Sequence, residues 1–372
     1  MMSSRFAPLL GVLLLLTSCT ADEPAQADSA MVFPGETWAT ATAESQGVDG
    51  AILQAALDTL AFYSGADGLD EVVVVRNGYV IHQGDSVHKA HNVYSVTKSI
   101  TSTALVLLVD EGKASLDKPV AEIEPMLAER YPSITFRTLA TMRSGYNADG
   151  PNRWGEASAD WSATPFEVGE PLFAPGSAYA YWDEAMIMMG RVLTRVAGES
   201  LYDYLDQRVM HPIGITDWSW WSEHEVDGIP VVYGATGISL NALDLARFGL
   251  LYLNDGVWDG TRLLPKHWVA EATINHVPAT IAIADTDRSA TDGRGIYGFN
   301  WWTNGVTPDG TRSMPDAPVG TYYASGLHNN MLFVVPEWDL LLVRRGEDGN
   351  PPAGKANVYN RVLRTLAPGI TV

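Results

Sequence analysis

The chain has 372 residues, of which 46% are hydrophobic and 18% charged, a composition typical of a globular protein. Its formal net charge of -20 argues against nucleic-acid binding, because that affinity depends largely on cationic contacts to phosphates. The single cysteine, Cys19, excludes an intrachain disulfide and a cysteine-based zinc cluster.

The first 18 residues have the pattern of an export signal. Arg5 provides a weakly basic start, and residues 9–16 form an apolar run that is shorter than the roughly 20 residues of a membrane span. The Leu-Thr-Ser-Cys sequence that ends at Cys19 resembles a bacterial lipobox, and Thr20 fits such proteins sorted to an outer membrane. We therefore expect an exported lipoprotein, anchored in the outer membrane only through lipid on Cys19 and facing the periplasm or the exterior. The alternative is an ordinary secretory signal with a chance cysteine.

Residues 19–38 are rich in Ala, Asp, Glu and Pro and are predicted to be a flexible tether, followed by one folded domain over residues 39–372. The domain is expected to begin with an amphipathic helix over residues 49–62. Two β-branched runs, residues 71–76 and 79–82, flank Asn77-Gly78 and predict a β-hairpin.

The next predicted helix spans residues 99–111 and ends at Gly112. Residues 115–265 are expected to be mostly helices and loops, with the clearest helices at 183–197 and 241–253. The chain then returns to strands at 331–335 and 340–344, joined by a turn at 336–339, and ends with a helix over 355–366.

This order of elements predicts an α/β (α+β) fold. The strands from both chain ends can pair into one antiparallel sheet flanked by helices, and the mainly helical middle forms a second lobe. A cleft between two such lobes is the usual place for a binding site.

The first candidate for chemistry is Ser95, which precedes Lys98 by three residues where an extended stretch enters an apolar helix. Side chains at this spacing share one helical face. The helix N-terminus contributes a partial positive charge that suits an oxyanion, and a buried lysine can act as a base. The motif alone is weak, because it occurs by chance in many proteins and a serine before a helix is usually an N-cap.

The order of several surrounding segments makes the motif specific. The matching segments are Arg76-Asn77-Gly78, Tyr94 to Ser99, Ser115 to Val120, Ile134 to Gly145, Pro175 to Tyr181, Gly237 to Leu240 and Asp244 to Gly249. On these segments, residues 40–366 resemble the serine β-lactamase and penicillin-binding protein superfamily. The resemblance is to class C β-lactamase-like hydrolases, related esterases and 6-aminohexanoate-dimer hydrolases. It implies a β-lactamase/transpeptidase-like fold and the catalytic residues Ser95 and Lys98.

The family's second catalytic box, Tyr-x-Asn, stands here as Tyr181-Trp182-Asp183. The resemblance implies that Tyr181, rather than the nearby Tyr179, relays protons with Lys98. Asp183 departs from the usual asparagine and, when ionised, only accepts hydrogen bonds. Two interpretations stay open: Asp183 binds a substrate amine or hydroxyl, or it pairs with Lys98 or caps the following helix.

The third box, usually Lys-Thr-Gly or His-x-Gly, is best matched by Ala324-Ser325-Gly326. The resemblance implies that Gly326 admits the substrate and that the N–H groups of Ser95 and Leu327 form the oxyanion hole. The cationic residue of the box is missing, which disfavours β-lactams and favours an ester or a small amide. Arg344 or Arg345 is a possible replacement, but consecutive strand residues face opposite ways.

Two further residues are expected near the cleft, namely Trp182 and His328. The other tryptophans considered, expected in the core or as surface cover, are Trp161, Trp220, Trp221, Trp301 and Trp302. No acidic cluster has metal-ligand spacing, and no cofactor is implied. The predicted substrate-binding residues are thus Trp182, Asp183, Ser325, Gly326, Leu327 and His328.

We therefore expect a serine hydrolase that cleaves a small-molecule ester or amide through an acyl-enzyme on Ser95. The principal alternative is a penicillin-binding protein, or a weak β-lactamase or DD-peptidase, that β-lactams acylate at the same serine. A degenerate scaffold is a third interpretation, disfavoured because Ser95, Lys98 and Tyr181 are all present. The motifs specify a class of reaction rather than one substrate.

Overall fold

The computed structural model describes residue 1 and residues 31–155, 160–284, 291–349 and 354–371. The predicted export signal and Cys19 lie outside these ranges. Within the described ranges, no helix is long and apolar enough to cross a membrane. The same residues contain no group of three or more His, Cys, Asp or Glu side chains placed to hold a metal ion.

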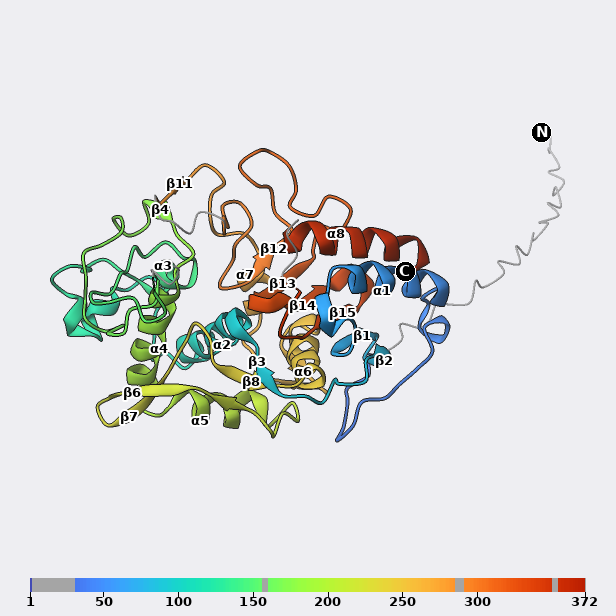
Figure 1. Cartoon of the computed structure of the whole chain (residues 1–372), viewed down its shortest axis with the longest axis horizontal. Helices are drawn as coiled ribbons and strands as arrows, with labels where there is room; N and C mark the ends of the chain where they lie inside the picture. The colour runs from blue at the N-terminus through green and yellow to red at the C-terminus, as the bar shows by residue number, and fades with distance from the viewer. Residues whose placement is uncertain (2–30, 156–159, 285–290, 350–353, 372) are drawn as a thin grey trace. The chain divides into compact units, whose positions relative to one another are not determined.

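One six-stranded antiparallel sheet joins the two ends of the domain, as predicted (Figure 1). Its strands, in spatial order, are β12 (Trp302–Thr303), β13 (Tyr322–Gly326), β14 (Asn330–Val335), β15 (Leu340–Arg344), β1 (Val72–Arg76) and β2 (Tyr79–Gln83). The N-terminal strand β1 pairs directly with the C-terminal strand β15, in a register that sets Val72 opposite Arg344. At the predicted hairpin, Asn77 and Gly78 both have positive φ, the backbone that a tight two-residue turn requires.

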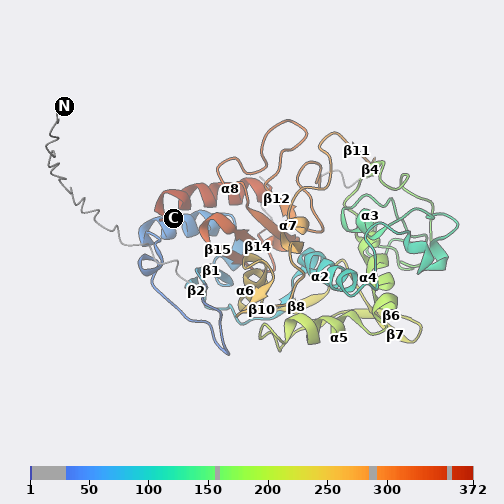
Figure 2. The ribbon, with the colours of Figure 1, turned by 180° about the vertical axis from the view of Figure 1, so that it is seen from behind.

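Helices cover both faces of this sheet. Successive strand residues point to opposite faces, so each strand contributes side chains to two cores. Val72 and Val74 belong to a core shared with α1 (Gly50–Phe62) and α8 (Lys355–Leu366). Val73 and Val75 belong to a second core shared with α2 (Thr97–Asp110) and α6 (Ala242–Leu253). Figure 2 shows α1 and α8 side by side along one face, with α6 beneath the sheet on the other. This double burial explains why the strands read as continuous apolar runs.

The middle of the chain is mainly helical, and α2 lies at its centre with residues 97–108 buried. The other helices are α3 (Phe136–Ala140), α4 (Asp183–Ala197), α5 (Leu201–Leu205) and α7 (Trp268–Ala272). Short strands also occur there: β3 (His91–Asn92), β4 (Ala178–Tyr179), β5 (Ser219–Trp220), β6 (Ser222–Val226), β7 (Ile229–Val232), β8 (Ile238–Leu240), β9 (Val257–Trp258), β10 (Thr261–Arg262) and β11 (Ala282–Ile283). The mixed α+β prediction is confirmed, with short strands that the sequence pattern missed.

Two boundaries differ from the predictions. Helix α2 begins at Thr97, two residues earlier than predicted, directly after a single 3-10 turn. Residues 31–38 of the predicted tether pack on the domain. The Phe33 ring packs edge-on against the Trp258 ring, with 5.2 Å between the ring centroids. The buried guanidinium of Arg247 also donates hydrogen bonds to backbone carbonyls of residues 34–36. Ring contacts and hydrogen bonds to its carbonyls therefore fix this short stretch, whose sequence, Met-Val-Phe-Pro-Gly-Glu-Thr-Trp, is mostly apolar.

Candidate active site

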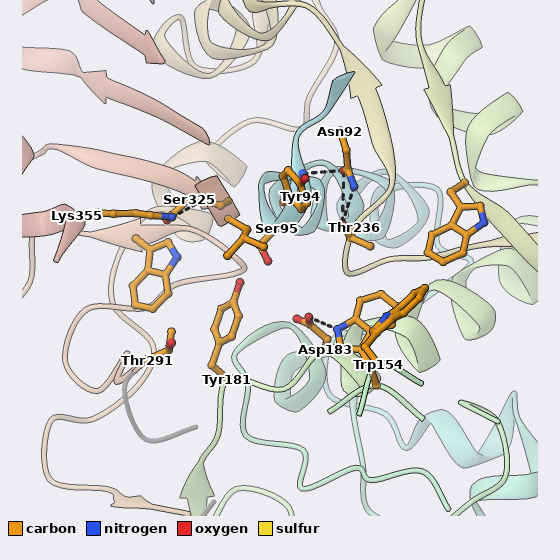
Figure 3. A pocket seen from close by; sticks show the side chains of 15 residues that line it. Asn92, Tyr94, Ser95, Trp154, Tyr181, Asp183, Thr236, Thr291, Ser325 and Lys355 are labelled. Carbon is orange, nitrogen blue, oxygen red and sulfur yellow. Dashed lines mark hydrogen bonds between the residues drawn. The ribbon is translucent and has the colours of Figure 1, made fainter. Parts of the chain in front are cut away.

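A cavity of about 520 Å³ lies where the sheet meets the helical part of the chain, and Figure 3 shows the side chains around it. It is lined by the start of the α2 segment, the end of β13, the start of α4 and the start of α8. The lining residues are Asn92, Tyr94, Ser95, Trp154, Trp161, Tyr181, Asp183, Trp221, Thr236, Thr291, Trp302, Ser325, Gly326, Leu327 and Lys355.

Ser95 sits in the 3-10 turn Tyr94–Val96 that leads into α2. The turn begins with Tyr94 at φ 51, a conformation uncommon for a residue with a side chain. Asn92 stabilises it, since its Oδ1 accepts from the Tyr94 N–H at 2.8 Å and from the Gly237 N–H at 3.2 Å. The serine is therefore presented to the cavity by a fixed turn at the N-terminus of a buried helix.

Lys98 lies one turn further along the chain and is 1% exposed. Its Nζ donates to Ser95 Oγ at 2.7 Å and to the Ala235 carbonyl at 2.9 Å. It also lies 2.7 Å from Asp183 Oδ1, in an ion pair. Two hydrogen bonds and one ion pair therefore hold this buried ammonium group beside the serine.

Asp183, the first residue of α4, lies between Lys98 and Trp161. Its Oδ1 pairs with Lys98, and its Oδ2 accepts a hydrogen bond from Trp161 Nε1 at 2.6 Å. Of the two interpretations left open by the sequence, the structure thus shows the pairing with Lys98. It caps no helix, because Trp182 is the N-cap residue of α4.

Tyr181 lines the cavity, and Figure 3 shows its hydroxyl directed toward Ser95. The Tyr181 ring stacks on Trp302, with 5.7 Å between ring centroids, and Lys98 Nζ lies 4.9 Å from the centroid of the Tyr181 ring. Tyr179 is fully buried instead and packs against Tyr297. Burial raises the pKa of Tyr179 well above its ordinary value. Tyr181 is therefore the tyrosine that the fold brings beside the serine and the lysine.

The third box lies where predicted, at the end of β13. Ser325, Gly326 and Leu327 all line the cavity. A Cβ atom added to Gly326 would overlap the carbonyl oxygen of Val93 and lie 3.3 Å from the Ser95 nitrogen. Glycine is thus required because the strand passes directly against the turn that carries the serine.

A cation does lie beside this box, on Lys355, which the sequence reasoning did not identify. Lys355 is the first residue of α8; its Nζ donates to the Gly326 carbonyl and, at 3.4 Å, to Ser325 Oγ. Burial, with a smaller contribution from the charge of Arg344, lowers its pKa to about 8. The only sequence feature that could have indicated Lys355 is its place at the predicted start of the last helix, which is distant in sequence from residues 324–326.

Several other predicted residues lie elsewhere. Trp182 is 5% exposed and does not line the cavity; its Nε1 donates to Glu184 Oε2 at 3.3 Å. Four other tryptophans line the cavity instead: Trp154, Trp161, Trp221 and Trp302. His328 does not line the cavity but packs edge-on against Tyr94, which does, with 5.1 Å between the ring centroids.

Neither arginine replaces the missing cation. Arg344 is buried and donates to the carbonyls of His328 and Ser64. Arg345 is also buried and donates to the carbonyls of Leu240 and His91. Arg344, the last residue of β15, and Arg345, which follows it, thus both donate to backbone carbonyls inside the fold.

The chain is similar to known proteins over most of its length. The family model "Beta-lactamase" matches residues 65–359. The 6-aminohexanoate-dimer hydrolase of Paenarthrobacter ureafaciens is 25% identical over 300 residues, covering 74% of this chain and 71% of that protein. The lovastatin esterase of Penicillium rubens is 30% identical over 150 residues, 33% of this chain and 37% of that protein. A putative 6-aminohexanoate-dimer hydrolase from Bacillus anthracis shares the fold, with a TM-score of 0.62, 20% identity, and 78% and 76% of the two chains covered.

Proposed function

Since the chain belongs to the Beta-lactamase family of serine hydrolases, we propose that it cleaves an ester or a small amide through an acyl-enzyme formed on Ser95. The observation that carries this proposal is the Ser95 hydroxyl, held 2.7 Å from the Lys98 Nζ inside a cavity. The names of two relatives, a dimer hydrolase and an esterase, support these two bond types.

In the proposed first step, Tyr181 is a phenolate: Ser95 Oγ attacks the carbonyl carbon, and the serine proton passes to the phenolate oxygen as the carbonyl oxygen becomes an oxyanion. An unperturbed tyrosine has a pKa of about 10, so it needs a positive neighbour to act as a base near neutrality. The Lys98 ammonium, 4.9 Å from the centre of the Tyr181 ring, supplies that charge, which the carboxylate of Asp183 partly offsets. The same proton then moves to the leaving oxygen or nitrogen as the bond to the carbonyl carbon breaks.

In the second step, a water molecule attacks the acyl-enzyme, and the same groups take its proton and return one to Ser95. We propose that the N–H groups of Ser95 and Leu327 bind the oxyanion in both steps. Each such donor typically contributes ~2.7–4 kcal/mol to the stabilisation of the transition state.

A second candidate function gains support from Lys355. An ammonium group beside Ser325 suits a substrate carboxylate, which β-lactams and peptide C-termini carry. A protein of this kind would be acylated by a β-lactam and would either release or retain the acyl group.

One experiment separates these candidates. Wild type, Ser95→Ala and Ser102→Ala are assayed with p-nitrophenyl acetate and nitrocefin, and intact mass is recorded after mixing with a β-lactam. Ser102 lies on the same helix, away from the cavity, and serves as the matched control. We expect at least about a thousandfold loss of ester turnover in Ser95→Ala alone. A long-lived β-lactam adduct without turnover would favour the binding protein, and full esterase activity in Ser95→Ala would exclude both candidates.

We further propose that the domain is displayed outside the cytoplasm on lipid attached to Cys19, on the strength of the lipobox-like sequence. Metabolic labelling with a fatty acid should mark the wild-type chain and not Cys19→Ser. Equal labelling of both would rule out this anchor.

A further inference from the structure

We propose that the cavity contains a subsite for an aromatic group of the substrate, formed by Trp154, Trp161 and Trp221. This inference rests on the proposed function, because it assigns a substrate class to the same site. The substrates it predicts are esters or amides in which one side of the scissile bond carries a flat aromatic ring.

Stacked rings build one wall of the cavity. Trp161 lies parallel to Tyr233, with 5.7 Å between centroids and 20° between planes. Tyr233 in turn stacks on Trp221 at 4.3 Å and 14°. The tyrosine between the two tryptophans is 2% exposed, so the core holds both rings in position.

Arg153 extends this wall to Trp154. Its guanidinium carbon lies 5.1 Å from the Trp221 ring centroid and 5.0 Å from that of Trp154. Glu223 holds the guanidinium through two hydrogen bonds of 2.6 and 2.7 Å, and the Tyr233 hydroxyl accepts a third at 3.0 Å. A charged group held so firmly fixes the two indole rings on either side of it.

Among these three tryptophans, Trp154 gives the clearest indication that the cavity binds a ligand. Its side chain is 63% exposed although it is large and apolar, and it lines the same cavity as Ser95. Exposed apolar surface gathered in a concave site is typical of a site that binds an apolar group. Rings stacked face to face favour a flat aromatic partner over a branched aliphatic one.

The subsite lies on one side of the nucleophile and the ammonium of Lys355 on the other. Figure 3 shows Trp154 and Lys355 on opposite sides of Ser95. A substrate that reaches both walls therefore carries its aromatic group on one side of the scissile carbonyl and a polar or anionic group on the other.

The test compares aromatic with aliphatic substrates in two series. Vinyl acetate, vinyl butyrate and vinyl benzoate vary the acyl side, and ethyl acetate and phenyl acetate vary the alcohol side. We expect Trp154→Ala to lower the aromatic-to-aliphatic ratio of kcat/KM about threefold to tenfold in one series, which also identifies the side that enters the subsite. Trp154→Phe should retain most of the ratio, and Phe62→Ala, an exposed aromatic residue outside the cavity, serves as control.

A ratio that Trp154→Ala leaves unchanged in both series would overturn the subsite. Binding is measured separately in Ser95→Ala protein by saturation-transfer NMR with benzamide, whose ring protons should receive saturation unless Trp154 is also replaced. If the wild type hydrolyses no ester but this signal appears, the proposed function fails and the subsite stands. If esters are hydrolysed and the signal is absent, the subsite fails alone.

Discussion

The cavity has a reaction side and a recognition side, which are built in different ways. On the reaction side, Ser95 and Lys98 stand three residues apart at the start of one buried helix, and their hydrogen bond follows from that spacing. The recognition side flanks Ser95 in both directions and comes from segments far apart in the sequence: Trp154 and Trp221 from the helical part, and Lys355 from the last helix.

This difference separates reaction from recognition. The nucleophile and its partner need one rigid local arrangement, so a short motif carries it. The walls need only a side chain of suitable shape and charge at the cavity, and loops and helix ends can supply one from many positions. Substitutions at the boundary between the two sides test that separation.

The largest effect is expected for Gly326→Ala. The new methyl group would overlap the Val93 carbonyl and displace the turn that presents Ser95, so we expect at least about a hundredfold lower kcat because a small misplacement at the reacting atoms is costly. Gly35→Ala is the matched control, since an added Cβ there meets no atom within 4 Å. Steady-state kinetics on p-nitrophenyl acetate would contradict this prediction if the two variants behaved alike.

The next effect concerns the buried ion pair. Asp183→Ala leaves the Lys98 ammonium, 1% exposed, without its carboxylate, and we expect a loss of about 3 kcal/mol in the free energy of unfolding. Asp183→Asn keeps an oxygen that can accept the hydrogen bond from Trp161, so its free energy of unfolding should fall by less. Urea denaturation measures both variants, and equal stability of Asp183→Ala and wild type would show that the pair contributes nothing.

Most of the fold could be predicted from the sequence, because its signals are local. The Asn77-Gly78 turn, the strand Val72–Arg76 and the bounds of α8 all follow from short-range pattern. For the candidate site, the family resemblance predicted Ser95, Lys98, Tyr181 and the box of residues 324–326, and the fold brings these residues to one cavity. The pairing of Asp183 with Trp161 and the contact of Lys355 with Gly326 arise only when distant segments pack.

Trp182 illustrates the remaining error. It stands between two cavity residues in sequence, Tyr181 and Asp183, so proximity along the chain placed it in the cleft. At the extended residue preceding a helix, neighbouring side chains point in different directions, and Trp182 turns into the core. For the tryptophans that do line the cavity, no pattern in the neighbouring sequence predicts that position.

Lys355→Met tests the recognition side. If the ammonium binds a substrate carboxylate, the variant should lose about tenfold in kcat/KM for a carboxylate-bearing ester relative to its neutral methyl ester. The wild-type preference should itself fade as pH rises through about 8, because the lysine then loses its charge. An unchanged preference in the variant would exclude Lys355 as the anion partner.

The same lysine has a signature in stability that is independent of catalysis. Its folded-state pKa of about 8 lies below the ordinary value of 10.5, so between these pH values the unfolded chain binds more protons than the folded one. The free energy of unfolding should therefore rise with pH across this window in wild type relative to Lys355→Met. Parallel pH curves for the two proteins would contradict the buried placement.

The smallest effect is expected for Trp161→Phe, at the point where the two sides meet. Phenylalanine keeps a ring against Tyr233 but removes the Nε1 donor to Asp183 Oδ2, leaving the carboxylate freer to turn away from Lys98. We expect a few-fold loss in kcat, of the order of one hydrogen bond to a charged group, with a smaller change in KM. Trp221→Phe lines the same cavity without this contact and should change KM for aromatic substrates more than kcat. The opposite pattern would mean that Trp161 serves recognition alone and that the reaction side is complete without it.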